Sequence, residues 1–417
     1  MGCRWKRRRI SPTSLPLTSG SSPTTSSTAS RPRCPTRCRT RRNKAMTTTT
    51  TDAIVIGGGV IGCAIGYYLA KAGVATTILE RGEIGMEATN AATGVLSHSY
   101  GDPADPYTRL VNTGLSMFHE LAPELAEASG VDIELAQCGE LQLALNEEQA
   151  HYEQAVAAEL GWFDNGAQWL DAQKVREMEP LVSENIAGAL FMPKVCRVNN
   201  QRLSMAYAHS SQRLGATVLE HTEVIGLVRS GMRIRGVRLH SGELSADHVI
   251  IAAGPWTASI AEVLGSDVPV RPVRGVNLNL KPISGNINAV VHGGWGLLAP
   301  RNDGTVVVGA TVEEAGFDNR VTAGAVQSIM NMCELIIPSL RDASLNWALS
   351  GLRPGSPDDA PMLGAVPGWQ GLHCATGHFR SGILLSAITG KLMAEHITGE
   401  EPDLINHFSP ARFGRMG

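Results

Sequence analysis

The chain has 417 residues, of which 43% are hydrophobic and 18% are charged. This length and composition are typical of a globular protein with more than one domain, and they exclude a fibrous or wholly disordered chain. The formal net charge of −3 is unevenly distributed, because residues 1–45 hold 12 of the 36 basic residues and no acidic residue. The rest of the chain has 24 basic and 39 acidic residues, and this acidic balance argues against nucleic-acid binding.

The basic segment over residues 1–45 is rich in Arg, Ser, Thr and Pro and has almost no apolar periodicity. Such a segment buries too little apolar surface to order itself, so we expect it to be disordered. Transit peptides and nucleic-acid-binding arms share this composition. A third interpretation is that Met46 is the natural start and that the preceding residues have no role. The segment lacks the apolar region of a secretory signal.

The strongest motif lies in residues 53–81, AIVIGGGVIGCAIGYYLAKAGVATTILER. Its pattern predicts a strand over 53–56, a glycine turn, a helix over 60–72 and a second strand over 75–79. Three glycines have the G-x-G-x-x-G spacing, in which they allow a sharp turn, a close approach of pyrophosphate and tight helix–strand packing. These glycines are Gly57, Gly59 and Gly62.

The residues beside this turn suit a dinucleotide. The helix begins at Val60 and Ile61, where free N–H groups and partial positive charge attract a phosphate. Glu80 follows about 20 residues after the glycines, where a carboxylate accepts hydrogen bonds from ribose hydroxyls and favours a free 2′-hydroxyl. The segment that comes next, residues 83–96, is rich in small side chains and favours the long cofactor FAD over NAD.

Two other interpretations of this stretch compete with dinucleotide binding. Residues 53–70 form an uncharged run of about 18 residues, which is long enough for a membrane span. The five glycines in that run, three of them consecutive, favour a turn instead. A glycine-rich loop without function would not require a strand before it, a helix after it and an acid at this distance.

The 8 cysteines and 12 histidines form no metal-binding or redox pattern. The cysteines after residue 45 are scattered among apolar neighbours, which is typical of buried, inert thiols rather than of a redox pair or a flavin linkage. We therefore expect a cytoplasmic protein that binds no metal.

The periodicity of the whole chain predicts an α/β fold with two domains. A discontinuous Rossmann-like cofactor domain takes residues 46–101, 191–268 and 347–417. An α+β substrate domain with a large antiparallel sheet takes residues 102–190 and 269–346. Helices are expected over 106–130, 147–161, 172–177, 200–214, 321–336 and 383–398. Strands are expected over 139–145, 217–220, 223–228, 235–239, 248–252, 271–280, 290–292, 296–299, 305–310 and 371–375.

The chain resembles the D-amino-acid oxidase family of FAD-dependent amine oxidases over about residues 52–401. The resemblance rests on the glycine motif and on the segments ATNAATGVL (88–96), GLRPG (351–355) and GHFRSGIL (377–384). The segment 299–320 is similar to its counterpart in the glycine oxidase group of this family.

The resemblance implies oxidative deamination of glycine, another small amine or a D-amino acid. The electron acceptor would be O2, which is reduced to H2O2. The imino acid formed from the substrate would hydrolyse to an oxo acid and ammonia. The implied pathway is thiamine biosynthesis. Two alternatives stay open, which are a D-amino-acid or sarcosine dehydrogenase with another acceptor and a flavin-binding protein without turnover. We also expect a homo-oligomer with no transmembrane segment.

Two arginines match the family's catalytic and substrate-binding positions. Arg353 matches the arginine that binds the substrate carboxylate, a task for which a planar guanidinium is well shaped. Arg380 matches a second position beside substrate and flavin, although it would also suit a helix cap or a contact with FAD alone. An ion-paired surface arginine is the alternative for Arg353.

The resemblance also implies a set of FAD contacts. No catalytic histidine is implied, because positioning and the flavin's own electronics are sufficient for the reaction, and His378 fits a place near FAD. Val224 also suits an ordinary strand of the core. The implied contacts are Gly57, Gly59, Val60, Ile61, Gly62, Glu80, Arg81, Ala88, Thr89, Thr93, Gly94, Val95, Val224, Gly254, His378, Phe379, Arg380, Ser381, Gly382, Ile383 and Leu384.

One position departs from the glycine oxidase pattern. Those enzymes have a substrate-facing tyrosine just before the P-R-x-x-G hairpin, and here the position falls at about Leu297, which has no hydroxyl. Trp295 is a candidate substrate-binding residue for the same space, since its indole N–H donates one hydrogen bond, and a packing aromatic is the alternative. The change puts specificity for glycine in doubt more than amine oxidation.

Overall fold

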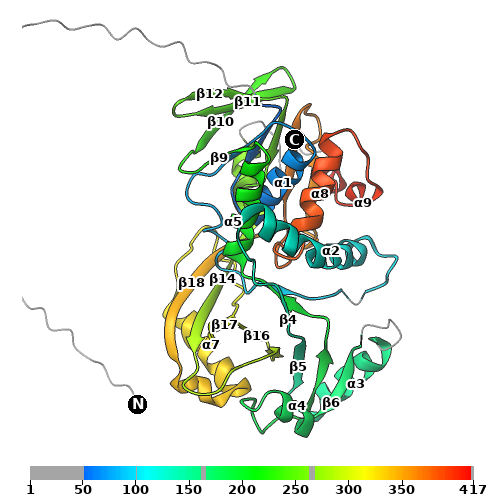
Figure 1. Ribbon diagram of the computed structural model, residues 1–417, viewed down its shortest axis with the longest axis vertical. Coiled ribbons are helices and arrows are strands. Elements are labelled where there is room, and N and C mark those ends of the chain that lie inside the picture. The colour runs from blue at the N-terminus through cyan, green and yellow to red at the C-terminus, as the bar shows by residue number, and fades with distance from the viewer. Residues whose placement is uncertain (1–50, 100, 161–165, 263–267, 415–417) are drawn as a thin grey trace, which may run out of the picture. The chain divides into compact units, whose positions relative to one another are not determined.

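Two large sheets organise the protein, and helices pack against each of them (Figure 1). The computed structural model describes residues 51–99, 101–160, 166–262 and 268–414. The basic segment 1–45 lies outside the described residues, so its disorder and its three interpretations stay predictions.

The first sheet has six strands in the order β19-β20-β13-β1-β2-β9. All neighbouring strands are parallel except β19 and β20, which are antiparallel. Every residue of β1 and β2 is buried, as expected of central strands covered on both faces. The strands are β1 (Ala53–Ile56), β2 (Thr76–Leu79), β9 (Thr217–Leu219), β13 (His248–Ile251), β19 (Met362–Ala365) and β20 (Leu372–Thr376).

Four helices build the main apolar core beside this sheet. Helix α1 begins directly after the glycine turn and packs on α5 and α8, as Figure 1 shows. Small residues permit the close packing of α1 on β2 and on α8. A Cβ on Gly66 would overlap the Ile78 side chain, and one on Gly390 would lie 2.8 Å from the Ala64 oxygen. The helices are α1 (Val60–Lys71), α2 (Pro106–Ser129), α5 (Asn200–Arg213) and α8 (Ser386–Ile397).

The second sheet has eight strands in the order β18-β14-β17-β16-β15-β5-β7-β6. Its pairs are antiparallel with one exception, since β15 and β5 are parallel. Helix α7 (Ala323–Ile336) buries Ile329 and Ile336 in a separate core on this sheet. The strands are β5 (Glu140–Ala144), β6 (Gln168–Asp171), β7 (Gly188–Met192), β14 (Arg271–Lys281), β15 (Val290–Gly293), β16 (Gly296–Pro300), β17 (Val306–Gly309) and β18 (Ser344–Gly355).

Short elements complete the described part of the chain. Two small antiparallel sheets are β10-β11-β12 and β3-β8-β4. Their strands are β3 (Val95–Leu96), β4 (Ala136–Gln137), β8 (Cys196–Arg197), β10 (Val224–Ser230), β11 (Arg233–Leu239) and β12 (Gly242–Ser245). The other helices are α3 (Glu147–Leu160), α4 (Ala172–Met178), α6 (Thr257–Glu262) and α9 (Asp403–Asn406), with 3₁₀ turns η2 (Gly254–Trp256), η3 (Pro338–Asp342) and η4 (Pro410–Phe413).

Strand β18 is the main element that the sequence did not predict. It pairs with β14 from Arg271–Gly355 to Lys281–Ser344, so residues 347–355 belong to the eight-stranded sheet and not to the segment after it. Its glycines and Pro354 resemble a loop in sequence, but pairing along the whole length of β14 holds them extended. The proposed division into two domains stays a prediction.

The described residues offer neither a membrane span nor an obvious metal site. No helix among them is both long enough and apolar enough to cross a bilayer. Within the same residues, no group of three or more His, Cys, Asp or Glu side chains is arranged to hold a metal ion.

Three histidines meet beside the six-stranded sheet. The Nδ1 atom of His248 on β13 lies 3.2 Å from Nε2 of His373 on β20, and the rings of His373 and His396 are 5.2 Å apart. Burial, with the charges of the two neighbouring histidines, lowers the pKa of His373 to about 3. Burial also lowers the pKa of His248 and His396, opposed by Asp247 and Glu401 respectively.

This cluster predicts acid-sensitive stability. In the unfolded chain the histidines titrate near pH 6.5, so below that pH the unfolded state binds more protons and the folded state loses stability as the pH falls. Each histidine that stays neutral contributes a slope of about 1.4 kcal/mol per pH unit in this range. His373→Leu should therefore reduce the difference in urea midpoint between about pH 7.5 and about pH 5.5.

The matched control is His407→Leu, which replaces an exposed histidine. It should keep the pH dependence of the unmodified protein. An unchanged pH dependence in His373→Leu would contradict the proposed contribution of the cluster.

Candidate active site

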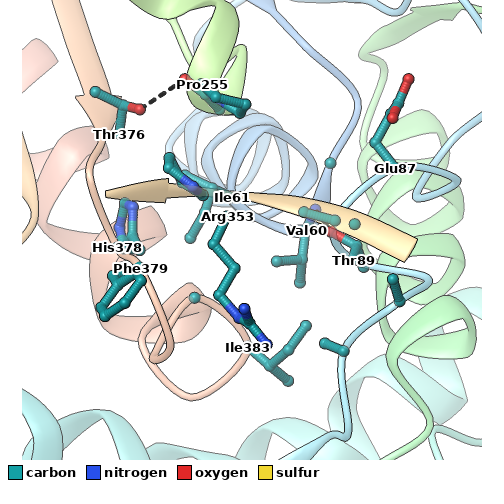
Figure 2. Close-up of a pocket in the computed structure, with 18 of the residues that line it drawn as sticks. Val60, Ile61, Glu87, Thr89, Pro255, Arg353, Thr376, His378, Phe379 and Ile383 are labelled. Carbon is teal, nitrogen blue, oxygen red and sulfur yellow. Dashed lines mark hydrogen bonds between the residues drawn. The ribbon is translucent and has the colours of Figure 1, made fainter. Parts of the chain in front are cut away.

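A cavity of about 920 Å³ lies between the carboxyl end of β1 and the strands β14 and β18. This volume is within the range of about 300–1,000 Å³ found for ligand sites. Figure 2 shows Arg353 in the centre beside Ile61, with Val60 and Thr89 on the right and His378 and Phe379 on the left. The cavity therefore joins the glycine turn to the segments GLRPG and GHFRSG.

The glycine turn is held in place by two side chains. Gly57 has a φ of 109°, a conformation that favours glycine, and a Cβ on Gly62 would overlap the Gly57 carbonyl oxygen. The Glu80 carboxylate accepts from the N–H groups of Gly58 and Gly82, each at 2.7 Å. The Thr89 hydroxyl accepts from the Val60 N–H at 3.1 Å. Each Glu80 oxygen keeps an acceptor site, and Glu80 lines the cavity.

Side chains from elsewhere in the chain anchor the segment 88–95. Asn277 of β14 donates to the carbonyl oxygen of Ala91, and Asn200 donates to that of Ala92. Arg301, from the hairpin between β16 and β17, donates to the Thr93 carbonyl oxygen at 2.8 Å. Three neighbouring carbonyls are thus fixed by three different elements.

An aromatic residue that the sequence prediction did not include lines the cavity beside Glu80. The Arg81 guanidinium lies over the Trp256 ring, 4.0 Å from its centroid, and also pairs with Glu87 at 2.9 Å. The Phe317 ring lies 5.7 Å from that of Trp256. Trp256 follows the strand predicted over 248–252, and nothing in the sequence indicates that its ring reaches Arg81.

Arg353 projects from β18 into the cavity (Figure 2). Its Nη1 donates to the Thr311 carbonyl oxygen at 3.1 Å, and its guanidinium occupies the space that a Cβ on Gly275 would fill. Burial, together with the charge of Arg380, lowers the pKa of Arg353 to about 10. Among the described residues no carboxylate forms an ion pair with Arg353, so the alternative of an ion-paired surface arginine does not describe it.

Arg380 is the second cation at the cavity. It is exposed and lies beside Phe379, with its guanidinium carbon 5.3 Å from the ring centroid. It also contributes to a small neighbouring pocket with Tyr107 and Asp359. Its charge acts on Arg353 across the cavity wall.

His378 is buried and neutral. Its exposed fraction is 2%, and its Nε2 lies 3.0 Å from the Thr389 hydroxyl. Burial lowers the pKa of His378 to about 3. A side chain in this state does not carry protons at neutral pH, and its role near FAD stays a prediction.

Most of the predicted site residues line the cavity. They are Gly57, Gly59, Val60, Ile61, Glu80, Arg81, Ala88, Thr89, Thr93, Val95, Val224, Gly254, Trp295, Arg353, His378, Phe379, Arg380, Gly382 and Ile383.

Four predicted residues lie behind the lining. Gly62 packs on the glycine turn, and Gly94 lies against Asn200. The hydroxyl of Ser381 is 2.9 Å from that of Tyr107, and Leu384 belongs to the apolar core. Their neighbours in sequence line the cavity, so any role of these four would pass through the backbone.

The position of the expected tyrosine is part of the cavity. Leu297 of β16 and the half-exposed Trp295 both line it. His292 of β15, which no sequence motif indicated, lies on the same wall. The structure thus brings together the two candidates for this position and adds an ionisable group.

These features fit FAD. The cavity contains a glycine turn with open space beside Gly59, where an added Cβ would have only the Thr89 hydroxyl as a neighbour, at 3.6 Å. It also contains an acceptor for ribose hydroxyls in Glu80 and a helix N-terminus for phosphate.

Comparison with known proteins gives one consistent family. The family model described as "FAD dependent oxidoreductase" matches residues 52–396. A glycine oxidase of Bacillus licheniformis is 32% identical over 349 residues, which cover 84% of this chain and 93% of that protein. The crystal structure of glycine oxidase from Geobacillus kaustophilus aligns with a TM-score of 0.82 and 32% identity over 87% of this chain and 99% of that one.

A longer relative matches over part of its length. The protein named "Bifunctional protein ThiO/ThiG" of Trichormus variabilis is 29% identical over 378 residues, which cover 88% of this chain and 56% of the relative.

The bonds of Glu80 predict how a variant loses the cofactor. Glu80→Ala removes the acceptor of two N–H groups at the turn, and each unsatisfied donor costs about 1–3 kcal/mol. FAD affinity should fall by about 10-fold or more. Fluorescence titration of the apoprotein with FAD measures this change. Glu83→Ala, at an exposed neighbouring acid, is the control, and equal affinities in the two variants would refute the role of Glu80.

Proposed function

This chain belongs to the family of FAD dependent oxidoreductases, and from that premise we propose that it oxidises glycine or another small amine or D-amino acid with O2 as the acceptor. The observation that carries the proposal is the Arg353 guanidinium. It enters the same cavity as the glycine turn and has no carboxylate partner among the described residues.

Arg353 would bind the substrate carboxylate. Burial disfavours its charge, as its lowered pKa indicates, and a carboxylate in the cavity would supply the missing opposite charge. Thr311 occupies one donor at Nη1, while the planar fork offers further donors for two parallel bonds. Arg380 would add positive potential that attracts an anionic group to the cavity.

The remaining residues would hold the cofactor and shape the site. Glu80 and the Thr89-anchored turn would bind the ribose and pyrophosphate, and the residues 378–383 would lie along the flavin. FAD, when bound, supplies a two-electron acceptor for hydride from the α-carbon. Water hydrolyses the released imino acid to an oxo acid and ammonia, while O2 is reduced to H2O2.

The choice of substrate depends on the wall at Trp295 and Leu297. With no hydroxyl at Leu297, the indole N–H of Trp295 is the one donor that these two side chains offer. We therefore propose a small amine or amino acid without restricting it to glycine.

Three further parts of the proposal concern the cellular setting. The likeness to the protein named ThiO/ThiG supports the role in thiamine biosynthesis that the sequence resemblance implied. The cytoplasmic location and the association into a homo-oligomer rest on the sequence alone.

Peroxide release is the direct test of this function. The purified flavoprotein is mixed with glycine, sarcosine and D-alanine, with peroxide followed in air and flavin bleaching followed without oxygen. Peroxide from any of them supports the oxidase. Bleaching without peroxide would indicate a dehydrogenase with another acceptor, and no bleaching would leave FAD binding without amine oxidation.

Arg353 variants test the carboxylate contact. Arg353→Ala should lower kcat/KM by about 100-fold or more, because two charge-assisted hydrogen bonds are lost. Arg353→Lys keeps the charge but loses the planar fork, so its kcat/KM should lie between those of Arg353→Ala and the unmodified protein. Arg341→Ala, at an exposed arginine, is the control. A kcat/KM in Arg353→Ala equal to that of this control would exclude the contact.

A further inference from the structure

An ionisable pair lies at the cavity wall, outside the segments on which the family resemblance rests. His292 of β15 lines the cavity, with its side chain 35% exposed. Glu140 of the neighbouring strand β5 lies behind it, with its side chain 6% exposed. The two strands run parallel with Val290 opposite Glu140, which puts Glu140 and His292 on one face of the sheet as diagonal neighbours. The Nδ1 of His292 is 3.7 Å from Oε1 of Glu140.

The buried acid has few other partners. Its second oxygen, Oε2, accepts from the Ser97 hydroxyl at 3.4 Å, and no lysine or arginine among the described residues forms an ion pair with it. Burial raises the pKa of Glu140 to about 7, against the opposing effect of the Ser97 bond. Burial and the charge of Arg380 lower the pKa of His292. Glu140 can therefore change protonation near neutral pH, while burial and Arg380 favour the neutral form of His292.

The surroundings of the pair contain few other charges. The strands β7 and β16 place Met192 opposite Glu140 and Leu297 opposite His292. Gln142 lies opposite His292 and donates to Glu153 of α3 at 2.6 Å. Burial, together with the charge of Glu140, raises the pKa of Cys138, which lies just before β5. Burial, together with the charge of Arg380 in the loop after β20, lowers the pKa of His292.

Such a pair would assist the proposed reaction when the substrate arrives in its protonated form. An amino acid in neutral water carries an ammonium group, which has no lone pair to assist the departure of hydride from the α-carbon. Arg353 and Arg380 favour the carboxylate but oppose a positive charge nearby, so a neutral base that lines the same cavity would complete the site. His378 is buried against Thr389 and does not provide one.

We propose that His292 accepts the proton of the substrate ammonium and that Glu140 stabilises the resulting imidazolium. This inference rests on the proposed function. In the step, an N–H bond of the ammonium breaks and an N–H bond forms at Nε2 of the neutral imidazole. No electrons are gained or lost. The Nδ1–H faces Glu140, whose negative charge offsets the new positive charge on the ring, as in other sites where a buried acid orients a histidine base.

The pH profile of anaerobic flavin reduction tests this role. His292→Asn should slow reduction at neutral pH by about 100-fold. The loss should shrink as the pH rises, because the free substrate then loses its own proton in solution. A purely structural defect would not be rescued by alkaline pH. Glu140→Gln should move the acidic limb of the profile and reduce the rate less than His292→Asn does.

His209→Asn, at an exposed histidine of α5, is the matched control and should keep the profile of the unmodified protein. A second measurement, the pKa of His292 by NMR titration, should give a lower value in Glu140→Gln than in the unmodified protein. An unchanged value, or equal rates for His292→Asn and the control at every pH, would overturn the inference alone. If no amine reduced the flavin of the unmodified protein, the proposed function would fail, and the inference with it.

Discussion

The pairing of β14 with β18 is the constraint on which the cavity depends. Gly275 and Gly351 lie opposite each other in this register, two residues from the pair of Val273 and Arg353. Side chains at these positions point to one face of the sheet, so the absence of a Cβ on both glycines leaves space beside the Arg353 side chain. The guanidinium lies over Gly275, and the segment 88–91 approaches Gly351. A shift of one residue would turn Arg353 away from the cavity.

The charges around the cavity follow from its position between two sheets. The six-stranded sheet contributes backbone donors of the glycine turn and the carboxylate of Glu80, which suit a polar, anionic cofactor. The eight-stranded sheet contributes Arg353 and His292, and Arg380 approaches from the loop after β20. Because burial weakens the solvation of a charged group, a buried charge depends on a partner of opposite charge or on hydrogen bonds. Glu140 is such a partner within the protein, whereas Arg353 has none among the residues that the structure describes.

Local sequence was sufficient to predict the fold and the site wherever one short segment determines both the backbone structure and the ligand contacts. The glycine turn was predicted because strand, turn, helix and Glu80 follow one another within a single motif, and the alternation of strands gave the α/β fold. Strand β18 was missed because Gly351, Pro354 and Gly355 have low strand propensity and only the register with β14 holds them. The parallel contact of β5 with β15 was missed for a similar reason. It brings Glu140 to His292 through a pairing between strands far apart in the chain, which neither segment encodes alone.

The anchoring of residues 91–93 has a consequence for exchanging parts between related proteins. This segment closely follows the glycine motif in sequence, but its carbonyl groups accept hydrogen bonds from Asn200, Asn277 and Arg301, which lie more than a hundred positions further along the chain. A chimera that joined the first hundred residues of one family member to the remainder of another would take the carbonyl acceptors from the first parent and the side-chain donors from the second. The bonds would form only if the second parent had the same three donors. In a recombination library, the segment and its three donor residues should therefore be taken from the same parent.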